Sequence, residues 1–217
     1  MAAPDRMRRW VHPSLMLITD RSRLRDRSLE EMASLAVDGG VTAVQLREND
    51  LDGGGLYHLA VTVHAVLRGR ALLLVNDRID VAIAAGADGV HLPEHTLPLQ
   101  KLRDYVGDAC IVGRSVHSVE AAVRAEQEGA DYLQVGAVYE TTSHPGRAPG
   151  GIELLRAVAE AVRVPVIAVG GITPERVAEV IEAGADGIAV IGAILDADDP
   201  RAAARALHEA LRSAYGS

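Results

Sequence analysis

PVIAVGGITPERVAEVIEAGADGIAVIGAI, residues 165–194, is the stretch that decides the expected fold. It holds two continuous apolar runs, each closed by glycine, with an amphipathic segment between them that ends at Gly184. A glycine after a helical segment is the usual left-handed cap. Continuous apolar strands are typical of a parallel sheet whose faces are covered. The stretch therefore predicts a strand, a helix and a second strand parallel to the first.

The same pattern of a helix end, a glycine and a short apolar strand recurs along the chain. It is found at residues 38–48, 84–94, 127–137 and 182–193. Further apolar runs lie between these segments, at residues 15–19, 71–76, 109–113 and 165–171. Strands that alternate with helices in this way over 217 residues predict a single closed (β/α)8 TIM barrel that occupies residues 1–217 as one domain. The alternative is a doubly wound open sheet, but LITDRSRL (17–24) lacks the glycine-rich fingerprint of that fold.

The composition argues against several classes of protein. A net charge of −8 makes nucleic acid or an anionic membrane an unexpected partner, because both bind positive surfaces. Cys110 is the single cysteine, which fits a reducing compartment, and no apolar run is long enough to span a membrane. We therefore expect a cytoplasmic protein. Lys101 is the single lysine and falls in an amphipathic helical pattern, so covalent lysine chemistry is not expected.

Glycines after the seventh and eighth predicted strands predict a phosphate site. In a barrel of this kind the chemistry lies at the C-terminal ends of the strands, and phosphate often binds after strands seven and eight. Gly170 and Gly171 close the seventh strand, and Gly192 and Ala193 follow the eighth. Their backbone N–H groups can approach an anion, and a helix start adds partial positive charge. The alternative for Gly170 and Gly171 is a tight turn without a ligand.

Polar side chains at other strand ends are candidates for binding a substrate. These candidates are Gln45, Arg47, Asn76, Arg114, Ser115 and Thr141. Each arginine either holds an acidic group of the ligand or forms a salt bridge at the rim. Asp77 and Glu94 either coordinate magnesium or pair with a nearby arginine. Residues 139–151 are rich in proline and glycine and predict a loop at the active face of the barrel.

Two histidines lie on or beside predicted strands. His117 follows the fifth strand in IVGRSVHS (111–118). It is either an acid–base catalyst at the barrel mouth or a polar residue at a helix start, with Ser118 as the N-cap. His91 lies within a strand, and we expect it to pack or to form hydrogen bonds inside the barrel.

Several longer segments resemble the thiamine phosphate synthase superfamily. They are AVQLRE (43–48), LLVNDRIDVAIAAGADGVHLPE (73–94), GADYLQVGAVYETTSHPG (129–146) and the stretch 165–194 quoted above. The resemblance runs from about residue 15 to about residue 210. It implies a (β/α)8 barrel that binds a small phosphorylated thiazole.

One branch of this superfamily, the synthases, joins an aminopyrimidine pyrophosphate to the thiazole phosphate with the help of magnesium. The residues that match the synthase pattern are Gln45, Arg47, Asn76, Asp77, Ser115 and Thr141. The chain departs from that pattern at Asn49 and in TTSHPG (141–146), where synthases carry lysine, and at Thr96, where they carry a metal-binding aspartate. Because a departing pyrophosphate needs its charge neutralised, these departures argue against the synthase branch.

The segment GRSVHSVEAAVRAEQEGADY (113–132) is more similar to the other branch, the thiazole tautomerases. In that branch the histidine of GRSVHS is the acid–base residue, which corresponds to His117. The resemblance implies an isomerase of thiamine biosynthesis that aromatises thiazole carboxylate phosphate by proton transfer, with no metal or cofactor, and this is the predicted function. The alternatives are a magnesium-dependent thiamine phosphate synthase, with Asp77 at the metal, and a non-catalytic regulatory protein that binds thiazole phosphate. The resemblance also suggests a homodimer.

Overall fold

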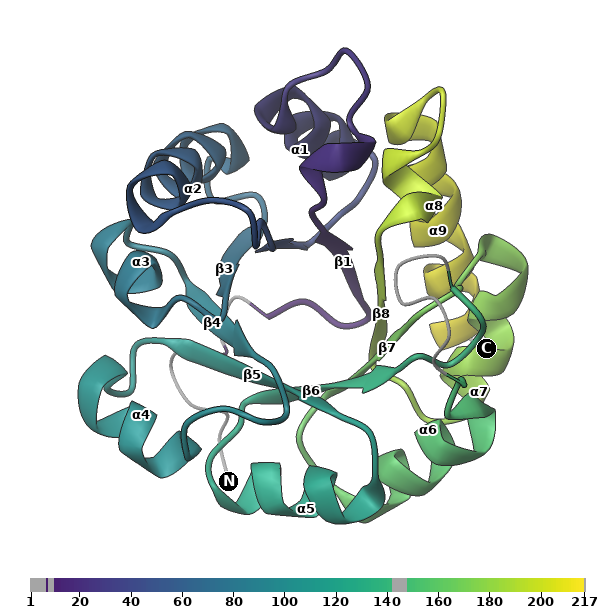
Figure 1. Cartoon of the computed structure of the whole chain (residues 1–217). Coiled ribbons are helices and arrows are strands. Elements are labelled where there is room, and N and C mark those ends of the chain that lie inside the picture. Colours follow the sequence, from purple (N-terminus) through teal and green to yellow (C-terminus); the bar gives the residue numbers. More distant parts are fainter. Residues whose placement is uncertain (1–6, 8–9, 142–147, 217) are drawn as a thin grey trace.

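The computed structural model describes residues 7, 10–141 and 148–216 and forms a closed parallel barrel. Each strand pairs with its neighbours in chain order, and β1 pairs with β8 to close the ring (Figure 1). The strands are β1 (Ser14–Ile18), β2 (Ala43–Leu46), β3 (Leu72–Asn76), β4 (Gly89–Leu92), β5 (Ile111–Val116), β6 (Tyr132–Gly136), β7 (Val166–Val169) and β8 (Gly187–Val190). The predicted (β/α)8 TIM barrel is therefore confirmed.

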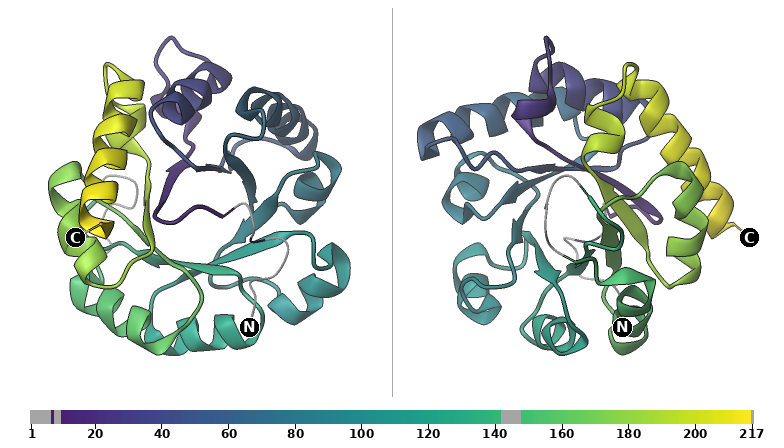
Figure 2. Two further views of the ribbon diagram at one scale, coloured as in Figure 1. Left: turned by 180° about the vertical axis from the view of Figure 1, so that it is seen from behind. Right: turned by 45° about the vertical axis from the view of Figure 1, so that its right-hand side comes forward.

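Helices connect the strands and cover the outside of the barrel (Figures 1 and 2). They are α1 (Leu29–Asp38), α2 (Gly53–Leu67), α3 (Ile79–Ala84), α4 (Leu99–Val106), α5 (Val119–Gln127), α6 (Gly151–Ala161), α7 (Val177–Glu182), α8 (Gly192–Leu195) and α9 (Pro200–Tyr215), with 3-10 turns η2 (Arg21–Arg23) and η3 (Pro174–Arg176). The last helix, α9, packs against both α7 and α1 and so closes the outer ring. No helix in the described part of the chain has both the length and the apolar character that a membrane crossing requires.

Side-chain capping explains where several helices begin. The Oγ of Ser118 accepts a hydrogen bond from the backbone N–H of Ala121 at 3.1 Å, so the predicted N-cap of α5 is confirmed. The Oγ of Ser28 accepts in the same way from the N–H of Glu31 at the start of α1. These caps end the loops that follow β1 and β5 and set the direction in which the chain leaves the barrel mouth.

The apolar core has two layers because side chains of a strand alternate between its two faces. The larger layer fills the space between the strands and the helices. The smaller one fills the barrel interior and includes Met16, Leu74 and Ile167. Trp10 belongs to the interior layer, and its ring lies 4.7 Å from that of Tyr132, the first residue of β6. The interior is thus packed at the N-terminal ends of the strands, which leaves the C-terminal ends to form a cavity.

Candidate active site

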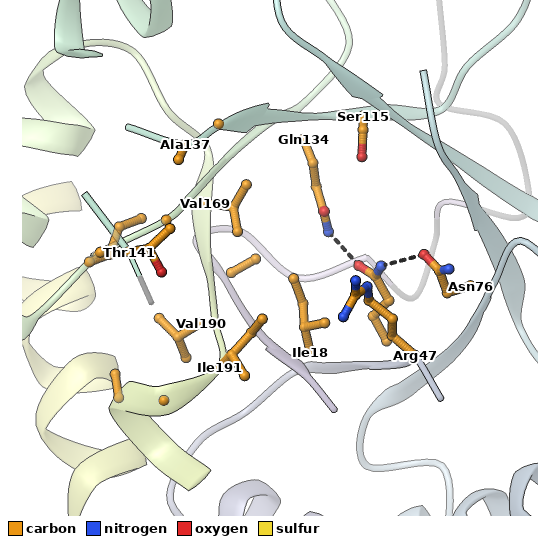
Figure 3. A pocket seen from close by; sticks show the side chains of 18 of the residues that line it. Ile18, Arg47, Asn76, Ser115, Gln134, Ala137, Thr141, Val169, Val190 and Ile191 are labelled. Atoms are coloured by element: carbon orange, nitrogen blue, oxygen red, sulfur yellow. Dashed lines mark hydrogen bonds between the residues drawn. The ribbon is translucent and has the colours of Figure 1, made fainter. Parts of the chain in front are cut away.

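A cavity of about 750 Å³ opens at the C-terminal ends of the strands. Residues from the end of every strand or from the loop after it contribute to its wall, which is the arrangement expected of an active site in this fold. Figure 3 shows Ser115, Gln134, Asn76 and Arg47 on one side and apolar residues such as Ile191 on the other. The cavity therefore has a polar part around β2–β6 and a second part bounded by β7 and β8.

A chain of amide groups crosses the polar part of the floor (Figure 3). The Nε2 of Gln134 donates to the Oε1 of Gln45 at 2.7 Å, and the Nε2 of Gln45 donates to the Oδ1 of Asn76 at 3.0 Å. Gln45, in the middle of the chain, thus accepts with its oxygen and donates with its nitrogen. Within the described residues nothing accepts from the Asn76 Nδ2, so this donor is available to a ligand.

The glycines after β7 are shaped by close backbone contacts. Gly170 and Gly171 have φ values of 102° and 65°, which disfavour residues with a side chain. A Cβ on Gly171 would lie 2.5 Å from the carbonyl oxygen of Glu140. Gly192 and Ala193 begin α8 and line the same end of the cavity. The four predicted phosphate residues therefore lie together, as their positions after β7 and β8 require.

Arg176 is a cavity residue that the sequence analysis missed. Its guanidinium donates to the carbonyl of Gly171 at 2.5 Å and lies 4.4 Å from the ring centre of Tyr139. The Tyr139 hydroxyl in turn donates to Glu179 at 2.7 Å; burial, and then this bond, raise the pKa of Tyr139 to about 12. The signal that identifies Arg176 is a basic residue in the first turn after the glycine pair, whereas the predicted site residues were those at the strand ends.

His117 and Glu94 meet at the cavity wall after β5 and β4. The Nδ1–H of His117 donates to the Oε2 of Glu94, and both side chains are largely shielded from solvent. The Nε2 of His117 is therefore the ring nitrogen available to a ligand. Glu94 holds the ring in one orientation, a second role beside the magnesium ligation considered from the sequence.

The remaining predicted residues divide into two groups. Gln45, Arg47, Asn76, Ser115 and Thr141 all line the cavity. Arg114 does not belong to the lining: it points to the outer face of β5, where both terminal nitrogens donate to the carbonyl of Leu97 at 3.5 Å. The prediction that Arg114 binds substrate is corrected for this reason, because alternate residues of a strand face opposite sides. Part of the predicted loop at 139–151, residues 142–147 with His144, lies outside the described residues.

Asp77 supplies a carboxylate that suits magnesium. It lines the cavity directly after β3 and has a left-handed backbone with φ of 60°. Among the described residues no group of three or more His, Cys, Asp or Glu side chains could hold a metal by itself. Mg²⁺ needs no such cage, since it commonly binds through one or two carboxylates together with substrate phosphates and water. The donor set therefore fits magnesium delivered with a phosphorylated substrate.

The comparisons with known proteins agree with this architecture. The family model for thiamine monophosphate synthase matches residues 15–194.

The chain belongs to this family.

Among the relatives of this family member, the thiamine-phosphate synthases of Haloquadratum walsbyi and Methanoculleus marisnigri are each 45% identical to it over 202 residues. The first alignment covers 91% of both chains, and the second covers 92% of this chain and 96% of the relative. A solved structure of thiamine phosphate pyrophosphorylase from Pyrococcus furiosus superposes with a TM-score of 0.83 at 38% identity, covering 93% of this chain and 96% of the other.

These relatives overturn the predicted function. The sequence analysis favoured a thiazole tautomerase, an isomerase with no metal or cofactor, but the curated relatives that span nearly the whole chain are named as synthases, which are transferases. The prediction was wrong because it treated missing lysines as missing positive charge. Arg47, Arg176 and His117 line the cavity of this family member, so cationic or proton-donating groups are present at other positions.

Proposed function

We propose that the protein is a thiamine-phosphate synthase that joins an aminopyrimidine pyrophosphate to a thiazole phosphate and releases pyrophosphate. The observation that carries the proposal is the nearly full-length similarity to proteins of that name at 45% identity. The cavity supports it, because a polar part with an amide chain and a glycine-lined part lie in one space large enough for two small substrates. The absence of an apolar membrane helix in the described residues fits a cytoplasmic enzyme.

Each of the two parts of the cavity binds one of the two substrates. The Nδ2 of Asn76 donates to an acceptor of the aminopyrimidine, and the hydrogen bond from Gln45 to the Asn76 Oδ1 holds the side chain in place. The phosphate of the thiazole binds the backbone N–H groups near Gly170, Gly171, Gly192 and Ala193, with Arg176 beside them. Thr141 lines the same cavity and contacts the thiazole. This arrangement brings the thiazole nitrogen to the methylene carbon of the pyrimidine.

The leaving pyrophosphate needs neutralisation from the protein. Asp77 would hold Mg²⁺, and the ion would supply positive charge that offsets part of the charge developing on the pyrophosphate oxygens. Arg47 binds a pyrophosphate oxygen through its guanidinium. His117, as an imidazolium whose Nδ1–H is held by Glu94, donates from Nε2 to the same group. His117 is thus assigned to the leaving group, in place of the carbon-to-carbon proton transfer expected from the sequence.

The test is formation of thiamine phosphate from the two substrates with Mg²⁺, followed by chromatography and by release of inorganic pyrophosphate. Equal amounts of both products, each dependent on both substrates, are expected. Controls omit one substrate at a time, which separates synthesis from hydrolysis of the pyrimidine pyrophosphate. Pyrophosphate release without thiamine phosphate, or no reaction at any magnesium concentration, would contradict the proposal.

A further inference from the structure

Below the cavity, three neighbouring strands contribute one row of residues inside the barrel. His91 on β4 lies opposite Gly113 on β5, and Gly113 lies opposite Tyr132 on β6. A Cβ at Gly113 would lie 2.4 Å from the Tyr132 oxygen, so only glycine leaves room for the phenol. Through this space the Tyr132 hydroxyl reaches the Nδ1 of His91 at 2.9 Å. The glycine therefore makes a direct contact possible between side chains two strands apart.

The other nitrogen of the same ring connects this row to the cavity. The Nε2 of His91 lies 2.8 Å from the Oγ of Ser115, and Ser115 lines the cavity while His91 does not. The expectation that His91 forms hydrogen bonds inside the barrel is thus confirmed. Through Ser115, the buried His91 ring is connected to the cavity in which a ligand would bind.

Both buried groups are uncharged near neutral pH. Burial, with a smaller effect from the charge of Arg114, lowers the pKa of His91 to about 3. Burial also raises the pKa of Tyr132 well above its usual range. The ring therefore carries one N–H hydrogen and the phenol keeps its O–H hydrogen, so one ring nitrogen must accept.

The position of Tyr132 decides which nitrogen accepts. Its side chain is 0% exposed, and within the described residues the only hydrogen-bond partner of its hydroxyl is the Nδ1 of His91. If Nδ1 carried the ring hydrogen, the buried phenol hydrogen would have no acceptor, which proteins strongly disfavour. The phenol must donate to Nδ1, and Nε2 then donates to Ser115. The Oγ of Ser115 is used as an acceptor, and its own hydrogen is left for the cavity.

We propose that Tyr132 and His91 are positioning residues that make Ser115 a hydrogen-bond donor toward the ligand. The part of the cavity beside Ser115 then favours an acceptor atom of the ligand, an oxyanion or an unprotonated ring nitrogen, because the Ser115 hydrogen points to it. The inference goes beyond the proposed function and does not depend on it, because the direction of the chain is a property of the free protein.

The test is the tautomer of His91 in the free, full-length, ¹⁵N-labelled protein, read from two-bond ¹H–¹⁵N spectra near neutral pH. His91→Gln identifies the signals of this ring among those of the other histidines. A protonated Nε2 and an unprotonated Nδ1 are the expected result. A protonated Nδ1, or averaging between the two tautomers, would overturn the proposal.

Two variants show which partner sets the tautomer. Tyr132→Phe keeps the ring and removes the donor, and we expect the His91 ring to become a mixture of tautomers or to protonate Nδ1. Ser115→Ala removes the other partner, and we expect the wild-type tautomer to persist. An unchanged spectrum in Tyr132→Phe, or a changed tautomer in Ser115→Ala, would each contradict the proposal. If Tyr132→Phe does not fold, the wild-type and Ser115→Ala spectra still decide. Since no substrate is present, failure of the synthase assay leaves this result unaffected.

Discussion

Asn76 accepts a hydrogen bond from Gln45, whose Nε2 lies 3.0 Å from the Asn76 Oδ1. Gln45 itself accepts from Gln134, so both bonds run in one direction, from Gln134 to Asn76. The consequence is that Asn76 presents nitrogen rather than oxygen to the cavity. A ligand must therefore meet it with an acceptor atom.

We expect Asn76→Asp to lower kcat/KM for the aminopyrimidine pyrophosphate by about tenfold or more, since an acceptor then replaces the donor at a cost of roughly 1.4 kcal/mol. The oxygen bonded to Gln45 is retained, so the fold should persist. Asn49→Asp is the matched control, because it adds the same charge elsewhere on the cavity wall. Equal losses in both variants would mean that added charge, and not the lost donor, causes the effect.

Asp77→Asn tests the metal site with little change in structure. Asparagine tolerates the left-handed backbone of Asp77, at φ of 60°, as well as aspartate does. We expect the magnesium concentration for half-maximal synthase activity to rise by about tenfold or more, and EDTA to abolish the wild-type activity. Asp80→Asn removes a carboxylate that pairs with Arg78 and lies outside the cavity lining, so it should leave the magnesium dependence unchanged. A normal magnesium titration of Asp77→Asn would remove Asp77 from the metal site.

Gly171→Ala and Gly86→Ala separate backbone strain from loss of the phosphate site. The two glycines have similar φ values, 65° and 62°, so the left-handed strain by itself should lower the free energy of unfolding by a similar amount, roughly 1–2 kcal/mol, in both variants. Only at Gly171 would the new Cβ meet backbone, 2.5 Å from the Glu140 oxygen, whereas nothing lies within 4 Å at Gly86. We expect the KM for thiazole phosphate to rise at least about tenfold in Gly171→Ala alone. Comparable kinetics in the two variants would refute the phosphate assignment.

Arg176→Gln should weaken binding of the thiazole phosphate. A charge-assisted hydrogen bond contributes about 1.5–3 kcal/mol, so KM should rise by about tenfold to a hundredfold, and kcat should change less. Arg156→Gln is the control, since Arg156 pairs with Glu153 on α6 and does not line the cavity. An unchanged KM at low and high salt would show that Arg176 only supports Gly171 and Tyr139.

The buried histidine makes stability depend on pH. The pKa of His91 is about 3 in the folded protein, below the ordinary value of 6.5, so the unfolded chain binds the proton more readily. The contribution of His91 to the free energy of unfolding is fully present above about pH 6.5 and is lost as the pH falls toward 3. Between about pH 8 and about pH 5 the loss is about 2 kcal/mol. Urea unfolding of wild type and His91→Gln across this range measures the loss of stability. Parallel curves of unfolding free energy against pH for the two proteins would disprove the assignment to His91.

The barrel and much of the cavity wall could be predicted from local sequence. Apolar runs with terminal glycines specify strands and helix caps within a few residues of one another, and parallel closure then places all strand ends at one mouth. For this reason the strand-end pattern predicts Gln45, Asn76 and Gly171 at the barrel mouth, and all three line the cavity. The choice between synthase and isomerase was wrong, because it rested on single positions such as Asn49 while charge can be supplied from elsewhere on the wall.

What the sequence determined by itself is the order of strands and helices, since each depends on neighbours along the chain. Only the tertiary structure decided which side chains meet. Strand alternation turns Arg114 away from the cavity, and the turn after β7 brings Arg176 to the glycines. The absence of a side chain at Gly113 lets Tyr132 reach His91. The physical reason is clearest for His91 and Tyr132, which lie 41 positions apart in the sequence but on strands of one barrel. Their direction and distance are set by strand register and barrel closure, which no local pattern contains.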